Sequence, residues 1–202
     1  MTDRKPRVGL LGGSFNPAHR GHLHISRMAL DRLALDQVWW LVSPQNPLKP
    51  SHGMAPLDER LATARNLANN SNIRVTDVER HLGTSYTADT LDALAESHPD
   101  TRFVWIMGAD NLIQIPRWKR WTSLFKAVPI AVFARPSYSL RALSGRAAKR
   151  FARARKLESR ASALAMMRPP AWVFLHTPLI GTSSTRIRDR AGGAQGSGTE
   201  NG

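Results

Sequence analysis

Apolar residues along this chain gather in short runs of about five, and longer stretches of mixed apolar and polar residues separate these runs. Short apolar runs indicate buried strands, whereas apolar residues that recur every three to four positions indicate helices. The runs predict strands at 7–11, 38–42, 73–78, 103–107, 130–134 and 172–176. The amphipathic stretches predict helices at 22–33, 57–69, 87–96, 111–115, 118–126 and 140–167.

Strands that alternate with helices are typical of the α/β class, in which right-handed crossovers place helices on both faces of a mostly parallel sheet. With 202 residues, of which 42% are hydrophobic, the chain can bury one substantial core. We therefore expect a single Rossmann-like domain over residues 1–190. Residues 191–202 are rich in glycine and lack apolar anchors, which predicts a disordered tail.

Composition narrows the class of protein further. The chain has no cysteine, so disulfides and thiolate metal sites are excluded. No apolar run approaches the roughly 20 residues that cross a membrane, and residues 1–6 lack a signal-peptide core, so we expect a cytoplasmic protein with no membrane partner. The net charge of +14 favours polyanionic partners such as nucleotides, pyrophosphate or nucleic acid.

Much of the positive charge lies between residues 141 and 160, on the last predicted helix. Apolar residues recur there at helical spacing, which predicts an apolar stripe on the core and a basic outer face. A solvated basic face is one interpretation and nucleic-acid binding is the other. No aromatic residues are interleaved on that face to stack on bases, so we do not expect specific nucleic-acid binding.

A glycine-rich segment with two histidines follows the first predicted strand. Residues 12–22 read G-G-S-F-N-P-A-H-R-G-H. The glycines let the backbone approach a ligand closely, Pro17 fixes the turn, and His19 and His22 lie where the next helix begins. An imidazole can donate a hydrogen bond or carry a positive charge near neutral pH. These features predict a phosphate site, although a glycine-proline turn with two capping histidines would share the pattern.

A second polar segment, T-S-S-T-R-I-R at 182–188, follows the last predicted strand. Its hydroxyl residues are good helix caps, and backbone amides in a first helical turn can hold phosphate oxygens. Arg186 adds a planar donor array that suits phosphate. Taken alone, the segment could equally be an ordinary capped helix with surface arginines.

Together, the two segments resemble the signatures of the nucleotidyltransferase superfamily. Residues 13–22 match G-x-F-x-P-x-H-x-G-H, and residues 182–188 resemble I-S-S-T-x-I-R with Thr182 in place of isoleucine. The resemblance implies in-line attack of a substrate phosphate on the α-phosphorus of ATP, with His19, His22 and Arg186 as catalytic residues. It also implies Mg²⁺ that arrives with ATP and no metal held by the protein itself. The ATP-binding residues implied are Gly13, Ser14, Phe15, His19, His22, Gly108, Asp110, Ser183, Ser184, Thr185 and Arg186.

Four further segments, at 44–50, 85–91, 105–112 and 117–119, resemble the bacterial nicotinate-nucleotide adenylyltransferases. This resemblance implies ATP and nicotinate mononucleotide as substrates and a role in NAD biosynthesis. The backbone amide of Thr87 would receive the nicotinate carboxylate, and Trp118 would stack on the cationic pyridine ring. The acceptor-binding residues implied are Asn46, Lys49, Thr87, Trp118 and Arg135, with Lys49 and Arg135 on the phosphate. Asn16 departs from the aspartate that is common at its position in this branch.

Two other functions share parts of this pattern. The same chemistry could act on another phosphate ester, such as phosphopantetheine or nicotinamide mononucleotide. An RNA-binding protein would use the basic surface, and His-x-Gly-His also resembles the ATP site of one class of aminoacyl-tRNA synthetases, but 202 residues leave no room for a complete synthetase. Whether the protein forms a homo-oligomer is not decided by the sequence.

Overall fold

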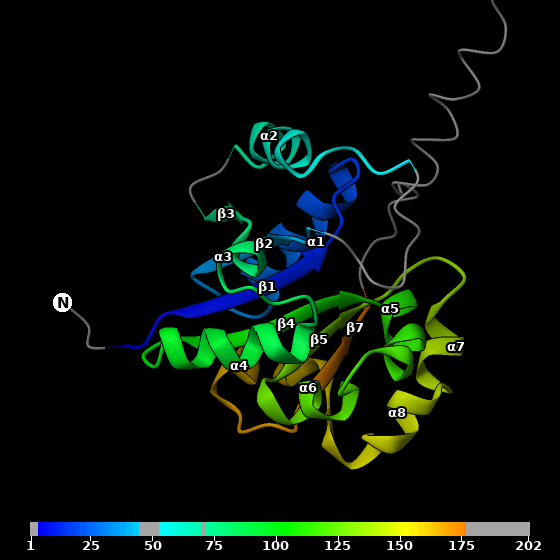
Figure 1. Ribbon diagram of the computed structural model, residues 1–202. Helices are drawn as coiled ribbons and strands as arrows, with labels where there is room; N and C mark the ends of the chain where they lie inside the picture. The colour runs from blue at the N-terminus through cyan, green and yellow to red at the C-terminus, as the bar shows by residue number, and fades with distance from the viewer. Residues whose placement is uncertain (1–3, 45–52, 70–71, 177–202) are drawn as a thin grey trace, which may run out of the picture.

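The computed structural model describes residues 4–44, 53–69 and 72–176, and its central element is one seven-stranded sheet (Figure 1). The strand order is β3-β2-β1-β4-β5-β7-β6, and every neighbouring pair is parallel. The strands are β1 (Arg7–Gly13), β2 (Gln37–Val42), β3 (Ile73–Thr76), β4 (Arg102–Gly108), β5 (Ile130–Phe133), β6 (Arg155–Lys156) and β7 (Trp172–Leu175). The prediction of an α/β fold with a mostly parallel sheet is confirmed.

Helices fill the connections between strands. The α-helices are α1 (Arg20–Arg32), α2 (Leu57–Leu67), α3 (Val78–His81), α4 (Thr87–Ser97), α5 (Ala109–Gln114), α6 (Trp121–Ala127), α7 (Ser139–Leu143) and α8 (Arg146–Arg150). Three 3₁₀ segments, η1 (Ile115–Arg117), η2 (Ala152–Ala154) and η3 (Glu158–Met166), complete the set. None of the described helices is long and apolar enough to cross a membrane.

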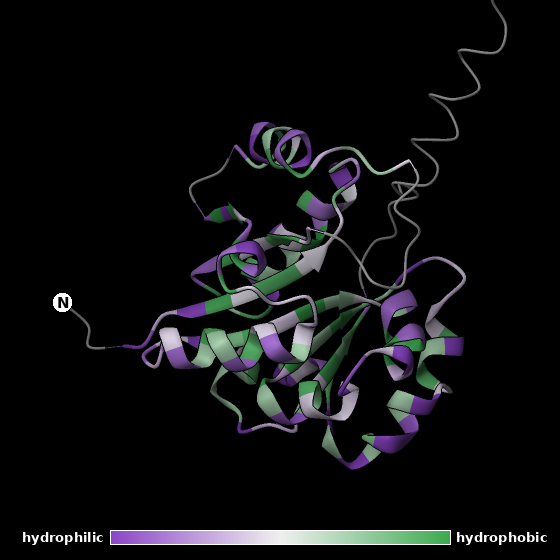
Figure 2. Cartoon of the chain, in the orientation of Figure 1, coloured by the Kyte–Doolittle hydropathy of each residue, from purple (hydrophilic) through white to green (hydrophobic). Residues whose placement is uncertain are grey.

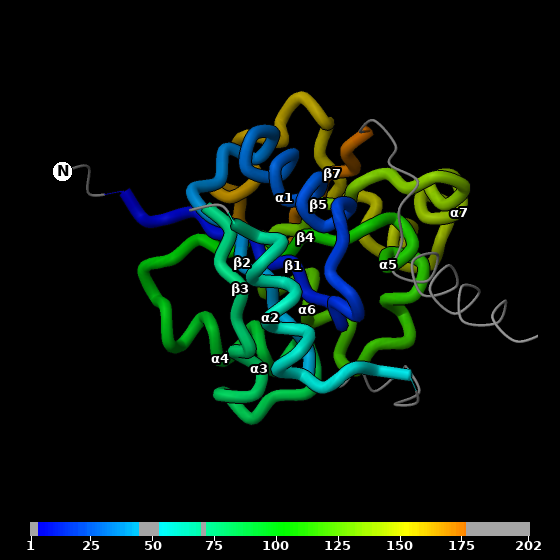
Figure 3. Tube along the Cα trace, turned by 90° about the horizontal axis from the view of Figure 1, so that it is seen from above, coloured from blue at the N-terminus to red at the C-terminus, as the bar shows by residue number. Residues whose placement is uncertain are grey.

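Two hydrophobic cores lie on opposite faces of the sheet. Alternation along β4 shows the division, because Phe103 and Trp105 belong to one core, whereas Val104 and Ile106 belong to the other. Helices α4 to α8 contribute to the first core, and α1, α2 and η3 contribute to the second. Figure 2 shows hydrophobic residues along the strands, and Figure 3 shows α1 and α4 on opposite sides of the sheet.

The order of strands reverses between β1 and β4. From β1 the chain moves through β2 to β3 in one direction, and from β4 it moves through β5 to β7 in the other. Open α/β sheets bind ligands in the crevice at such a reversal, beyond the carboxyl ends of the strands. Gly13 ends β1 and Gly108 ends β4, so both glycines border this crevice.

The predicted helix at 140–167 is wrong. The chain forms α7 and α8 there, followed by η2, the short edge strand β6 and η3. Gly145 interrupts the helix with extended backbone, and an added Cβ would lie 3.1 Å from the carbonyl oxygen of Ala142. Phe151, which follows α8, stacks on Phe125 of α6 with ring centroids 4.1 Å apart, and η2 and β6 come after it. These tertiary contacts outweigh the helical spacing of the apolar residues.

The other predicted elements are present with small changes of boundary. The strand predicted at 73–78 ends at Thr76, because Asp77 precedes the helix α3, which the sequence pattern did not predict. The two-residue strand β6 was also not predicted, since two residues carry no periodicity. The boundary of the domain at residue 190 and the tail at 191–202 lie outside the described residues.

Candidate active site

Two histidines form the entrance of α1. His19 is the N-cap residue, and its Nδ1 accepts a hydrogen bond from the backbone N–H of Gly21 at 3.1 Å. His22 Nδ1 accepts a hydrogen bond from the backbone N–H of His19, also at 3.1 Å. A backbone N–H can only donate, so neither Nδ1 carries a proton in this arrangement. The neutral form of each ring therefore carries its proton on Nε2, which makes Nε2–H a hydrogen-bond donor.

His19 is neutral at physiological pH. Its side chain is buried, and burial together with the nearby positive charge of Arg135 lowers its pKa from 6.5 to about 4. The sequence left open whether this imidazole donates a hydrogen bond or carries a positive charge. The structure favours a neutral donor at the helix entrance, where the backbone amides supply partial positive charge.

Phe15 supports the histidine pair from the core. Its ring is 1% exposed and lies 4.6 Å from the ring of His22 and 5.1 Å from Trp40 between centroids. Trp40 Nε1 donates to Ser26 Oγ at 2.7 Å, and Ser26 Oγ donates to the backbone oxygen of His22 at 2.8 Å. The side chain of Phe15 therefore packs between His22 and Trp40 in the core. A contact between Phe15 and ATP remains a prediction.

Asp110 and Arg135 form an ion pair beyond the ends of β4 and β5. Arg135 Nη1 donates to Asp110 Oδ2 at 2.5 Å, whereas Asp110 Oδ1 is buried and has no hydrogen-bond partner. A Cβ on Gly108 would lie 2.5 Å from that oxygen, so glycine is required for this placement of the carboxylate. Arg135 thus lies on the side of the predicted ATP residues, and its contact with the mononucleotide phosphate remains a prediction.

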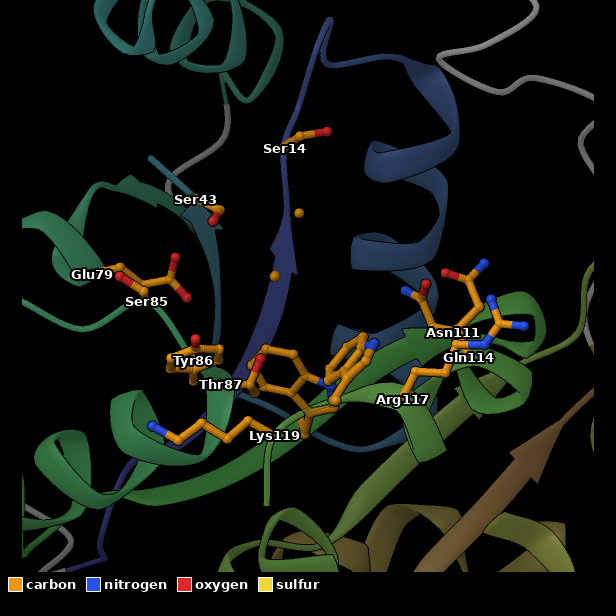
Figure 4. A pocket seen from close by; sticks show the side chains of 14 residues that line it. Ser14, Ser43, Glu79, Ser85, Tyr86, Thr87, Asn111, Gln114, Arg117 and Lys119 are labelled. Carbon is orange, nitrogen blue, oxygen red and sulfur yellow. The ribbon is translucent and has the colours of Figure 1, made fainter. Parts of the chain in front are cut away.

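A pocket of about 500 Å³ opens at the carboxyl ends of β1 and β4 (Figure 4). Four of the predicted site residues line it: Gly13, Ser14, Thr87 and Trp118. The wall residues that the resemblance did not name as binding residues are Gly12, Ser43, Glu79, Ser85, Tyr86, Trp105, Asn111, Gln114, Arg117 and Lys119. Of these, Ser43, Glu79 and Gln114 also lie outside every segment that the sequence singled out. Thr87 is the first residue of α4, where backbone N–H groups have no acceptor within the helix.

Two buried polar atoms of pocket residues have no hydrogen-bond partner. They are Glu79 Oε2 and Trp105 Nε1. Glu79 is 7% exposed, and burial raises its pKa, although the nearby hydroxyls of Ser43 and Thr90 oppose that rise. Unpaired buried polar groups are rare in folded proteins and gather at functional sites. Glu79 belongs to none of the segments that resemble the family and looks like a surface residue. Trp105 begins the segment 105–112, but in the sequence it looks like a strand residue of the core.

Arg60 connects the loops around the pocket. Its guanidinium is 2% exposed and donates to four backbone oxygens: to Ser14 at 2.6 Å, Ser43 at 2.8 Å, Pro44 at 2.9 Å and Ala55 at 2.9 Å. These oxygens belong to the histidine signature, to the end of β2 and to the start of α2. A single buried cation on α2 therefore fixes three loops of the site relative to one another.

Asn16 makes a second connection to the segment that precedes α2. Its Nδ2 donates to the backbone oxygen of Gly53 at 3.0 Å, and its Oδ1 accepts from the backbone N–H of Ala55 at 3.2 Å. The amide thus uses both its donor and its acceptor. An ionised aspartate could only accept, so the asparagine at this position makes a contact that the usual residue of the branch could not make.

The remaining predicted site residues cannot be placed. Asn46, Lys49, Ser183, Ser184, Thr185 and Arg186 lie outside the described residues. Within 4–44, 53–69 and 72–176, no group of three histidine or acidic residues could hold a metal ion.

The fold and site define an α/β protein of the Rossmann-like class, with a pair of histidines at the entrance of its first helix. Residues 10–190 match the family described as cytidylyltransferase-like. The chain is 55% identical over 184 residues to the probable nicotinate-nucleotide adenylyltransferase of Methylorubrum extorquens strain PA1, covering 91% of this chain and all of the relative. It is 53% identical to the protein of the same name from Parvibaculum lavamentivorans, over 92% of both chains.

The fold is also similar to that of solved structures. The nicotinic acid mononucleotide adenylyltransferase of Plasmodium falciparum, solved in complex with NaAD, matches with a TM-score of 0.69 at 18% identity. That match covers 91% of this chain and 83% of the Plasmodium chain. On the family match and the relatives at over 50% identity, the chain belongs to the cytidylyltransferase-like family and, within it, to the nicotinate-nucleotide adenylyltransferases.

Proposed function

We propose that the protein transfers the adenylyl group of ATP to nicotinate mononucleotide, forming nicotinate adenine dinucleotide and pyrophosphate in NAD biosynthesis. The observation that carries this proposal is a pocket whose wall joins Gly13 and Ser14, from the segment that leads to the histidine pair, with Thr87 and Trp118. Relatives at 53% and 55% identity bear the name of this activity over nearly the whole chain.

On the ATP side, the reaction needs the two substrates to be positioned and the negative charge on the transferred phosphate to be stabilised. It needs no covalent intermediate with the protein. The acceptor phosphate attacks the α-phosphorus in line, its oxygen forms the new bond, and the bond to the β-phosphate oxygen breaks to release pyrophosphate. The Nε2–H groups of His19 and His22 donate to phosphate oxygens in this proposal, and the first-turn amides of α1 add to their effect. Ser183, Ser184, Thr185 and Arg186 are proposed to hold the leaving pyrophosphate.

On the acceptor side, the first-turn N–H of Thr87 is the proposed donor to the nicotinate carboxylate. The indole of Trp118 offers a face to the cationic pyridine ring, and tryptophan is the aromatic side chain that binds cations best. Asn46, Lys49 and Arg135 are proposed to bind the remainder of the mononucleotide, with Lys49 and Arg135 on its phosphate.

Mg²⁺ is proposed to enter with ATP. The described residues offer no cage of three acidic or histidine ligands, but the unpaired Asp110 Oδ1 provides an oxygen that is compatible with an ion carried by the triphosphate. When bound, the ion neutralises charge on the phosphates. The cytoplasm is the location we propose for such an enzyme.

Release of pyrophosphate with a panel of acceptors tests the proposal. The purified protein is incubated with ATP, Mg²⁺ and nicotinate mononucleotide, nicotinamide mononucleotide or phosphopantetheine, each in a separate reaction. We expect nicotinate mononucleotide to have the highest kcat/KM. A higher kcat/KM for phosphopantetheine would replace the proposed acceptor but leave adenylyl transfer intact, whereas no pyrophosphate with any acceptor would contradict both.

A further inference from the structure

Positive charge is concentrated in the second half of the chain. From Asn111 to His176 there are fourteen lysine and arginine residues and one carboxylate, Glu158. That carboxylate already has two partners, because Arg32 Nη2 lies 2.7 Å from its Oε1 and His176 Nδ1 lies 2.8 Å from its Oε2. The positive charge of this region is therefore not balanced by acidic residues of the same region.

Five of these cations surround a hollow of about 620 Å³. They are Lys126, Lys149, Arg150, Arg153 and Lys156. The rest of the lining is apolar and comes from Phe151, Ala152, Ala154 and Pro170. In the part of the chain that the structure describes, none of the five cations pairs with a carboxylate. We call this feature the basic hollow.

The basic hollow is separate from the active site. Lys126 lies on α6 just before β5 begins at Ile130, and Pro170 lies just before β7 begins at Trp172. These residues flank the amino ends of β5 and β7, whereas His19 and His22 follow the carboxyl end of β1. Figure 1 shows α6 and α8 below the sheet, and Figure 2 shows hydrophilic residues along α8. Adenylyl transfer does not account for this cluster of charge.

Folding does not account for it either. Five like charges around one concave surface repel one another, and interspersed charges of both signs would be better for stability. A concave site lined by one sign of charge focuses the electrostatic field and raises the local concentration of counter-ions. The arrangement is therefore suited to an anionic ligand that offsets the repulsion.

The surroundings of the hollow indicate what kind of anion fits. Further exposed cations lie close to the lining residues in the sequence, at Arg141, Arg146, Arg155 and Arg160, which favours an extended polyanion over a small one. The volume lies in the range of pockets that hold one small ligand, which suits the width of a single strand. Phe151 is 7% exposed and offers no face for stacking on bases.

We propose that the basic hollow binds the phosphodiester backbone of single-stranded RNA, without preference for base sequence and independently of adenylyl transfer. Lysine and arginine side chains would contact the phosphates and release the counter-ions condensed on the strand. With five phosphates engaged, the logarithm of the association constant should fall with the logarithm of salt concentration with a slope of about −3.5. Affinity should then fall about 10²-fold between 50 and 200 mM salt.

Fluorescence anisotropy of a labelled oligouridylate with the full chain tests the proposal. The variant K149Q/R153Q removes two cations of the hollow and should reduce the slope by about 1.4. The control R27Q/R65Q removes the same charge from exposed positions on α1 and α2 and should leave the slope unchanged. Both variants should retain the wild-type rate of adenylyl transfer, which verifies that they are folded.

Three results would overturn the proposal. The first is no binding of oligouridylate at 50 mM salt. The second is an equal loss of affinity in R27Q/R65Q, which would mean that net charge alone drives binding. The third is that another polyanion binds more tightly than single-stranded RNA at equal charge and that K149Q/R153Q loses this binding. The polyanions to compare are inorganic polyphosphate, duplex RNA and anionic phosphatidylglycerol vesicles. The occupant of the basic hollow would then be a different polyanion.

Discussion

The ring of His22 lies 3.9 Å from the ring of His19 between centroids, and its Nδ1 accepts the backbone N–H of His19 itself. His19 Nδ1 accepts the N–H of Gly21 in the same turn. Each imidazole is therefore oriented by a backbone donor, and each has its proton on Nε2 in the neutral form. The pair thus acts as a helix cap and as a pair of oriented donors, which explains why the signature places the two histidines three residues apart.

The first prediction concerns the titration of His19. Its pKa is about 4 in the folded protein and 6.5 in the unfolded chain, so below pH 6.5 the unfolded state binds the additional proton. The free energy of unfolding should decrease as the pH falls from 6.5 to about 4. Urea unfolding across this range should show a shallower decrease in His19→Asn, which keeps a capping oxygen but does not titrate. An NMR titration midpoint for His19 at or above 6.5 would contradict this account.

The second prediction concerns His22→Ala. Loss of an oriented donor to the transferring phosphate should lower kcat by about 10²-fold or more, equivalent to about 3 kcal/mol. Steady-state kinetics measure the effect, and circular dichroism checks that the fold is kept. The matched control is His24→Ala on the same helix, which should retain most of the activity. If both variants were folded and equally active, His22 would have no catalytic role.

The third prediction concerns Arg60→Met. This change leaves the backbone oxygens of Ser14, Ser43, Pro44 and Ala55 without their buried donor. Unfolding free energy should fall by roughly 3 kcal/mol, and KM for the mononucleotide should rise about tenfold because the loops lose their relative positions. Arg65→Met, an exposed change on the same helix, serves as the control. Unchanged stability and KM in Arg60→Met would show that this cation does not position the site.

The sheet could be predicted because six of its seven strands are short apolar runs in the sequence. The histidine pair could be predicted because His19 and His22 belong to one local segment. It could not predict the helices between residues 140 and 167, where Gly145 and the stacking of Phe151 on Phe125 overrule the helical spacing. Arg60 and Glu79 were missed for a similar reason. A charged residue on a helix looks solvated until the packing of other elements buries it.

The fourth prediction concerns discrimination between the two mononucleotides. Nicotinamide mononucleotide replaces a carboxylate by a neutral amide, so it loses charge-assisted hydrogen bonds to backbone donors near Thr87. Two such bonds, at roughly 1.5–3 kcal/mol each, imply a preference of at least about 10²-fold in kcat/KM for the nicotinate form. Trp118→Ala should weaken both substrates to a similar extent, because both have a cationic ring. Comparable kcat/KM values for the two acceptors in the wild-type protein would contradict recognition of the carboxylate.

The proposed reaction moves the α-phosphate of ATP, as part of the adenylyl group, to nicotinate mononucleotide. The most direct test supplies this acceptor with ATP labelled at the α-phosphate and, in a parallel reaction, with ATP labelled at the γ-phosphate. Adenylyl transfer predicts that the α-label appears in nicotinate adenine dinucleotide and that the γ-label appears in pyrophosphate, in equal amounts. An α-label recovered only as AMP, or a γ-label recovered in the acceptor, would contradict the account.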